Sequence, residues 1–554
     1  MKRYAHDLKH FLCSRRFMIA VLVIALLSYG FAAANLTISI DDLEGDRYTG
    51  SGNQMLQAGR FGTVLSKLLR GGIWNTPFSV DVLAVILLIL AAVNLCILFR
   101  RIAGDQIPMM SFIIFGCVLI SYPLMNEIWE YSGANFNVCI GFFWDSAALL
   151  LVHGWLHSTG RRNHWALLLA SGAMMWVGSS YESLIPVYIF LVFALLALQI
   201  VYGPAGEKKL TEVLRQGLVY AGVLAAGLLL RLLVHQVILS VLDLESQTNG
   251  STVLYWSFWP VPVVIENLIQ EITQLYLLNG LIYFPITEFV AAFALFVVIS
   301  LAACRKHGAV LLLPGAGMLF SLFILSLIQG TASPYRTCQV FAVFVAFTAM
   351  VLITWIQNRQ WKRAGWVPAL LCAAACWLCV FQAVYLTNFL QANHMRSQEE
   401  AAVIRDIGTK LEAEYDPDKP VIFIGSYEIS DYTLEQVSIP EDSTAWKVYK
   451  KGLRKHSEIF YVPYDEAALS RKLPVTNVNS VLDWAVEAFG SQEAMYHLFE
   501  YYGFDYTPAD LDAYPEAAAY AQAQDMPVYP RNGCIAETDE YIIVRLGENL
   551  QLDS

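Results

Sequence analysis

Eleven long apolar runs occupy most of the first 390 residues of this 554-residue chain, and they restrict its fold more than any other feature. A helix of about 20 apolar residues crosses the hydrocarbon core of a bilayer, and it satisfies its own backbone hydrogen bonds there. The runs therefore predict an α-helical polytopic membrane protein with about 11 transmembrane helices. We place these spans at 17–36, 78–99, 108–125, 137–157, 165–180, 184–202, 216–241, 281–303, 309–328, 337–356 and 366–390.

The composition supports a membrane protein and divides the chain into two parts. Hydrophobic residues make up 56% of the chain and charged residues only 15%, which excludes a soluble protein with an ordinary surface. Residues 391–554 hold 13 Lys and Arg against 29 Asp and Glu, whereas the preceding residues hold 23 against 18. Neither part carries the basic excess of a nucleic-acid-binding protein. The bilayer is the expected partner, and no nucleic acid is.

Lysine and arginine gather at alternate connections between the spans, as the positive-inside rule requires of cytoplasmic loops. With the N-terminus in the cytoplasm, an odd number of spans places the C-terminal part outside. We therefore predict a multi-pass protein of the cell membrane with an extracytoplasmic C-terminal domain. The basic connections on the cytoplasmic side contain Arg100 and Arg101, Arg161 and Arg162, Lys208 and Lys209, Arg305 and Lys306, and Arg359.

Two domains are predicted, a multispan transmembrane domain over 1–390 and a small soluble α/β domain over 391–554. A charged helix is expected at 396–414, and the apolar run 421–425 is typical of a buried strand ended by a glycine turn. The last 25 residues contain a predicted β-hairpin over 531–546. Further helices are predicted at 465–472, 480–502 and 508–523.

An acidic pair, Asp41 and Asp42, follows the first apolar run directly. Two adjacent carboxylates near hydrocarbon are costly, so a chain that keeps them there is expected to use them on a substrate, a cation or a proton. The alternative is a loop whose carboxylates only face water.

The stretch after the acidic pair, 54–70, has its apolar residues on one helical face, while Arg60 and Lys67 lie on another. This pattern predicts a helix in the membrane surface. Its basic residues could bind a lipid phosphate within reach of the two aspartates. The alternative is an interfacial helix whose basic groups contact only lipid headgroups.

Four ionisable residues, Asp145, Glu182, Arg231 and Glu288, fall toward the outer ends of their spans. Charged residues inside a membrane usually line a cavity or pair with one another. One interpretation is an outward-facing polar cavity on which these residues converge. The other is that Arg231 pairs with Asp145 or Glu288 to neutralise a buried charge.

Four short motifs together resemble one enzyme family. They are Asp41-Asp42, Gln57–Phe61, Ser333–Arg336, and Met526–Gly533 with the closing strand 542–544. With these motifs spread over nearly the whole chain, the protein resembles the Gtr-type (type II) glucosyl transferases, which modify bacterial surface polysaccharide. The resemblance implies a multispan GT-C type glycosyltransferase domain. It also implies a polyprenyl-phosphate sugar donor, used at the extracytoplasmic face to transfer a hexose, with glucose favoured, to a polysaccharide or glycolipid acceptor.

This reaction assigns roles to several of the residues above. Arginine binds a phosphate with two parallel hydrogen bonds, so Arg60 and Arg336 are the candidates for the donor phosphate. The acceptor hydroxyl must lose a proton, so Asp41 or Asp42 is the expected general base. Three further residues, outside these two roles, are expected to bind substrate: Arg47, Glu182 and Tyr335.

The sequence does not decide whether a metal ion is bound, and it leaves two rival functions open. Because a lipid phosphate is a good leaving group, no cofactor is expected to be required, but a divalent cation could bridge the two aspartates. A surface polysaccharide polymerase would have the same kind of sequence. A transporter or flippase of lipid-linked sugars would be expected to show repeated halves, and no internal repeat is evident.

Overall fold

The computed structural model describes most of the chain, with gaps mainly in the connections between helices. The described residues are 2–43, 53–69, 77–129, 131, 134–158, 163–203, 209–246, 254–359, 366–475, 478–480, 482 and 492–550.

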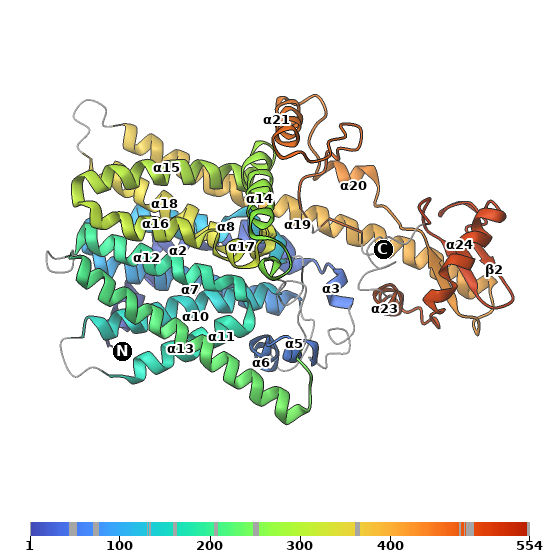
Figure 1. Ribbon diagram of the computed structural model, residues 1–554, viewed down its shortest axis with the longest axis horizontal. Coiled ribbons are helices and arrows are strands. Elements are labelled where there is room, and N and C mark those ends of the chain that lie inside the picture. Colours follow the sequence, from blue (N-terminus) through green and yellow to red (C-terminus); the bar gives the residue numbers. More distant parts are fainter. Residues whose placement is uncertain are drawn as a thin grey trace.

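A bundle of helices forms the larger part of the molecule (Figure 1). Nine helices of the described chain are long and apolar enough to cross a membrane, which confirms a helical polytopic membrane protein. The chain enters the bundle through the short helix α1 (Lys2–Leu12). The nine are α2 (Arg15–Ala34), α7 (Pro77–Ala103), α8 (Met109–Ser121, continued by η2 and α9), α10 (Ala134–Leu156), α12 (Ile185–Tyr202), α13 (Leu210–Leu242), α15 (Phe284–His307), α18 (Gln339–Asn358) and α19 (Val367–Glu414).

The predicted count of eleven spans is not confirmed, because the fifth and ninth predicted spans contain shorter helices. The fifth holds α11 (Trp165–Ser180), whose 16 residues reach about 24 Å, less than the roughly 30 Å of a hydrocarbon core. The ninth is divided between α16 (Leu312–Ser321) and α17 (Ile324–Gln329). Both short segments still pack in the bundle, α11 between α10 and α13 and α16 against α12.

The helices differ in how much of their surface the bundle covers. In the most apolar stretch of α12 and of α18, 78% of the residues are buried, whereas only 17% are buried in the corresponding stretch of α13. The uncovered residues of α13 include Leu229 and Leu233, which are suited to lipid contact. The inner helices therefore form the core, and α13 borders it.

The described residues after the first span form three short helices, α3 (Ile40–Leu43), α5 (Asn53–Gln57) and α6 (Phe61–Leu69). The single surface helix predicted over 54–70 is wrong, because the chain turns at Gly59, whose φ is +72°. Glycine reaches this left-handed conformation without the steric cost that a Cβ brings. After the turn, α6 packs against α11, so Arg60 lies at a bend rather than inside a helix.

The last membrane helix continues far beyond the bundle. Helix α19 has 48 residues, about 72 Å, so the last predicted span and the charged helix predicted at 396–414 are one element. Beyond it lies a three-stranded sheet in the order β1-β3-β2. Strand β1 (Val421–Ile424) is parallel to β3 (Ile542–Arg545), and β2 (Ile535–Glu537) is antiparallel to β3. The predicted buried strand and β-hairpin are confirmed.

The helices of the C-terminal part match the predictions less well. No helix occurs at 465–472, whereas α21 (Thr444–Phe460), capped by the Ser443 hydroxyl, was not predicted. Of the predicted helix 480–502, the described residues contain α23 (Glu493–Tyr501). The region 508–523 forms η12 (Leu511–Ala513) and α24 (Tyr514–Ala523), and a short α20 (Asp431–Glu435) precedes α21.

The turn at Gly59 can be tested by adding one methyl group. We expect Gly59→Ala to lower the free energy of unfolding by about 1–2 kcal/mol, because an L-residue is strained at this φ. Its Cβ would also lie 3.3 Å from the ring of His235. Gly222→Ala on α13 is the matched control, since no other atom lies within 4 Å of its added Cβ. Thermal unfolding in detergent measures both variants. A Gly59→Ala protein as stable as Gly222→Ala would contradict the turn.

Candidate active site

Asp42 is held in place at the end of α3. Its Oδ2 accepts hydrogen bonds from the backbone N–H and the hydroxyl of Ser39, at 3.0 and 3.1 Å. The backbone N–H of Asp42 in turn donates to the carbonyl of Ser39 at 3.1 Å, so the two residues are joined by three hydrogen bonds at the start of α3. Asp42 is only 5% exposed. The carboxylate therefore has a defined position and is not part of a freely solvated loop.

A second carboxylate, Asp81, lies near Asp42 and was not predicted as a site residue. Asp81 is at the start of α7, is 8% exposed and accepts a hydrogen bond from the side-chain amide of Asn135, at the start of α10. The charge of Asp42 acts on Asp81, so the two carboxylates are within electrostatic reach. The sequence carried one signal for Asp81: it is an ionisable residue inside a predicted span, and such residues usually serve a function.

Arg336 lies beside Tyr131, in the stretch between α9 (Asn126–Trp129) and α10. It belongs to η10 (Tyr335–Thr337), and its Nη1 donates to the hydroxyl of Tyr131 at 3.1 Å. Its guanidinium carbon also lies 5.7 Å from the centre of the Tyr131 ring. Arg336 is thus bound to Tyr131 and Asp81 to Asn135, two residues that are four positions apart in the chain.

Tyr335 is buried, and its hydroxyl is used inside the protein. It donates to the carbonyl of Leu275 at 2.7 Å and accepts from the amide of Asn279 at 2.8 Å. Glu127, which is 2% exposed, acts electrostatically on Tyr335 from the neighbouring α9. These contacts hold η10 against the elements around it. A substrate-binding role of Tyr335 stays a prediction.

Arg60 and Glu182 belong to a different group of residues, near the C-terminal end of α11 and the C-terminal half of α13. Glu182 forms an ion pair with Arg231 of α13, and a Cβ on Gly59 would lie 3.4 Å from the same guanidinium. The turn that carries Arg60 therefore packs beside this pair. The alternative prediction that Arg231 pairs with Asp145 or Glu288 is wrong, since its partner is Glu182.

The other two intramembrane carboxylates have separate surroundings. Both carboxylate oxygens of Glu288 accept from the amide of Gln382 at 2.9 Å. Asp145 is fully buried in α10, and its oxygens have no hydrogen-bond partner among the described atoms. Among the described residues, these contacts do not support a single cavity shared by Asp145, Glu182, Arg231 and Glu288.

Two of the predicted site residues fall outside the description. The side chain of Asp41 and the whole of Arg47 are not among the described atoms. Within the described chain, no three His, Cys, Asp or Glu side chains are grouped as a metal site requires. A cation bridging Asp41 and Asp42 stays a prediction.

The C-terminal part, from residue 391 onward, contacts residues 38–43, which carry Asp42 and are called here the Asp42 segment. Arg396 of α19 donates to the carbonyl of Ile38 at 2.6 Å and forms a buried ion pair with Glu400. His497 of α23 lies with Nδ1 2.7 Å from the carbonyl oxygen of Leu43, the residue after Asp42. The side chains of Ile38 and Leu43 are buried in the same apolar core as the strands of the C-terminal sheet.

A second contact joins the C-terminal part to the elements around η10. The hydroxyl of Tyr449, on α21, donates to Asn279 at 3.0 Å, and Asn279 in turn donates to Tyr335. Nearby, Nε2 of His456 lies 3.1 Å from the carbonyl oxygen of Gln270 in α14 (Val261–Thr273). The C-terminal part therefore contacts both the Asp42 segment and the surroundings of Arg336.

This arrangement defines a class: a polytopic membrane protein whose carboxylates and arginine lie at one end of a helical bundle. The sequence profile described as Glucosyl transferase GtrII matches residues 30–353, and the chain belongs to this family of glucosyl transferases. The match includes Asp42, Asp81 and Arg336 and ends within α18. No curated protein and no solved structure matches the chain. Family membership supports a transferase over the transporter alternative.

The ion pair of Arg396 and Glu400 provides a test of how the Asp42 segment is held. Arg396→Met should lower the free energy of unfolding by about 3–5 kcal/mol, because it removes the cation that pairs with the buried carboxylate of Glu400. The side chains of the pair are only 2% and 3% exposed. Thermal unfolding of the detergent-purified protein measures the change.

Two further variants make this test specific. Lys410→Met on the same helix breaks the more exposed pair with Asp406 and should cost less than about 1 kcal/mol. The double variant Arg396→Met/Glu400→Leu should regain much of the loss, because it removes both charges. Equal effects of Arg396→Met and Lys410→Met would show that the buried pair does not hold the segment.

Proposed function

We propose that this GtrII-family enzyme transfers glucose from a polyprenyl-phosphate donor to a cell-surface polysaccharide or glycolipid at the extracytoplasmic face. The observation that carries the proposal is a chain of contacts: Asp42 lies near Asp81, Asp81 is bound to Asn135, and Tyr131, four residues before Asn135, is bound to Arg336. A candidate base and a candidate phosphate ligand therefore lie at the same end of the bundle. In this proposal the donor lipid reaches them from the surrounding membrane.

The distribution of basic residues supports an extracytoplasmic site. The N-terminus and the C-terminal part lie at opposite ends of the bundle (Figure 1), and α3 lies at the C-terminal end. Arg100 and Arg101 end α7, and Arg305 and Lys306 end α15, at the end away from α3. Because cytoplasmic connections collect lysine and arginine, the Asp42 end faces outward in this proposal.

Arg336 is the proposed ligand of the donor phosphate. It is exposed and lies three residues before the start of α18, so the positive end of the helix dipole adds to its charge. A planar guanidinium binds two phosphate oxygens at once and stabilises the charge that the phosphate carries as it leaves. Arg60 lies in the other group of residues and is the proposed second contact along the lipid.

Asp42 is the proposed general base. The acceptor hydroxyl oxygen attacks the anomeric carbon of glucose while the bond from that carbon to the phosphate oxygen breaks. Asp42 takes the hydroxyl proton, and polyprenyl phosphate leaves. Asp81 begins a membrane helix and is bound to Asn135, so its proposed role is to position the site. The reaction requires no cofactor in this proposal.

Replacing the carboxylates separates these two roles. Asp42→Asn keeps an oxygen for the Ser39 hydrogen bonds but removes the base, so transfer should fall by about 10²- to 10⁴-fold. Asp81→Asn should cause a smaller loss. Asp105→Asn, on an exposed side chain beyond the far end of α7, is the control and should have no effect. The assay is glucosyl transfer by membranes adjusted to equal protein. Near-full activity of Asp42→Asn would remove it as the base.

The donor assignment is tested at Arg336. Arg336→Lys should weaken use of polyprenyl-phosphate glucose and Arg336→Ala should nearly abolish it, because lysine keeps the charge but loses the two-pronged fit. Arg359→Ala, on an exposed arginine at the opposite end of α18, is the matched control. Transfer from purified polyprenyl-phosphate glucose is measured for all three variants. A wild-type enzyme that rejects this donor but uses a nucleotide sugar would overturn the assignment.

A further inference from the structure

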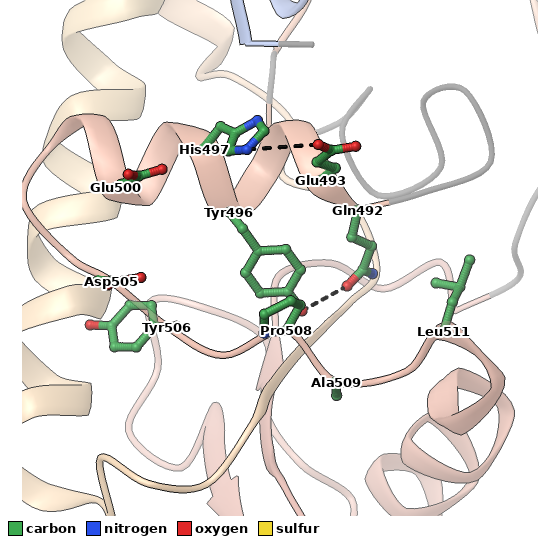
Figure 2. Close-up of a pocket in the computed structure, with 10 residues that line it drawn as sticks. All are labelled: Gln492, Glu493, Tyr496, His497, Glu500, Asp505, Tyr506, Pro508, Ala509 and Leu511. Atoms are coloured by element: carbon green, nitrogen blue, oxygen red, sulfur yellow. Dashed lines mark hydrogen bonds and ion pairs between the residues drawn. The ribbon is translucent and has the colours of Figure 1, made fainter. Parts of the chain in front are cut away.

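The C-terminal part contains a hollow of about 430 Å³ next to α23 (Figure 2). This volume is within the range of roughly 300–1,000 Å³ that is usual for small-ligand sites. One wall is α23, and the other is the chain that follows it, up to the start of η12. The lining residues are Gln492, Glu493, Tyr496, His497, Glu500, Asp505, Tyr506, Pro508, Ala509 and Leu511.

The aromatic walls of the hollow are fixed by hydrogen bonds to the backbone. The Tyr496 hydroxyl donates to the carbonyl of Val421 at 2.6 Å, and the Tyr506 hydroxyl donates to the carbonyl of Gly408 at 3.1 Å. Burial raises the pKa of both phenols, so both hydroxyls keep the proton that they donate. The two rings are therefore rigid surfaces, and Figure 2 shows the Tyr496 ring extending from α23 into the hollow.

Three carboxylates predominate among the polar groups of the hollow, beside the Gln492 amide and His497, whose Nε2 lies 3.8 Å from Glu493. Glu493, Glu500 and Asp505 are exposed carboxylates, and the ten lining residues include no lysine or arginine. Such a lining repels a phosphate or an acidic chain. It suits a neutral saccharide, whose hydroxyls donate to carboxylates and whose apolar faces lie against aromatic rings.

The hollow is connected to the Asp42 segment through one of its own residues. His497 lines it and lies with Nδ1 2.7 Å from the carbonyl oxygen of Leu43, one residue beyond Asp42. Helix α23 also packs directly against α3. A saccharide in the hollow would therefore lie beside the segment that carries the proposed base.

We propose that this hollow binds the acceptor, a neutral glycan chain, and directs its reacting end toward Asp42. This inference rests on the proposed function and names the acceptor site within it. The residues of the hollow, 492–511, lie wholly outside the family match at 30–353.

The test removes two carboxylate charges from the hollow of the full-length protein in nanodiscs. Glu500→Gln/Asp505→Asn should weaken binding of a fluorescently labelled neutral polysaccharide by about tenfold or more, because charge-assisted hydrogen bonds are lost. The probe is the surface polysaccharide of source cells that lack this gene. In transfer assays the KM for acceptor should rise by a similar factor, with the KM for donor unchanged.

The control is Glu435→Gln/Glu516→Gln, which removes two exposed carboxylates from α20 and α24, outside the hollow. It should bind and transfer as the wild type does, and equal melting temperatures would show that both double variants fold. If the first double variant is unstable, the single variant Glu500→Gln replaces it.

The outcomes separate this inference from the proposed function. Unchanged binding and unchanged acceptor KM in the first double variant, with normal wild-type transfer, would overturn the acceptor site alone. A wild type that binds the glycan but transfers nothing from polyprenyl-phosphate glucose would overturn the proposed function. If the wild type neither binds nor transfers, both are overturned.

Discussion

The buried guanidinium of Arg396 joins two parts of the protein that are far apart in the sequence. It lies on the helix that leaves the membrane, pairs with Glu400 on the same helix and donates to the carbonyl of Ile38, 358 residues earlier. A buried charge without partners is very costly, so these contacts are expected to form together. The Asp42 segment is thereby attached to α19, and its apolar side chains Ile38 and Leu43 are buried in the C-terminal core.

The polar residues of the site lie at the ends of membrane helices, where charged groups are less costly than inside hydrocarbon. Inside hydrocarbon the helices satisfy their own backbone groups, and charged side chains are costly. Asp81 and Asn135 begin membrane helices, and Arg336 lies three residues before the start of one. The site is therefore assembled from helix ends and short connections, while the helices themselves determine the spacing between those ends.

The sequence predicted the membrane part well because apolar runs report directly on the length of a helix in lipid. It predicted the β-hairpin because its apolar runs flank a turn. It did not predict α21, in which three of the six residues between the buried Trp446 and Leu453 are lysines. The break at Gly59 was also missed, because an apolar face can continue across a turn that only tertiary contacts with α13 reveal.

The candidate site could be predicted only in part. Asp42 and Arg336 were selected because charged residues at membrane ends and short family motifs are visible in a sequence. Asp81 was missed because it stands inside a run otherwise typical of a span. Its contact with Asn135, 54 residues away, depends on how α7 and α10 pack, which spacing alone does not show. Whether these residues act on substrate is decided by the transfer assays.

The unbroken length of α19 makes the C-terminal part sensitive to the membrane itself. A membrane helix adapts to bilayer thickness by tilting. Over a helix of about 72 Å, a tilt of about 5° moves the far end by about 6 Å. The contacts of α23 with α3 and of α21 with Asn279 resist such a movement. A change in the thickness of the surrounding lipid thus strains the contacts that hold the Asp42 segment.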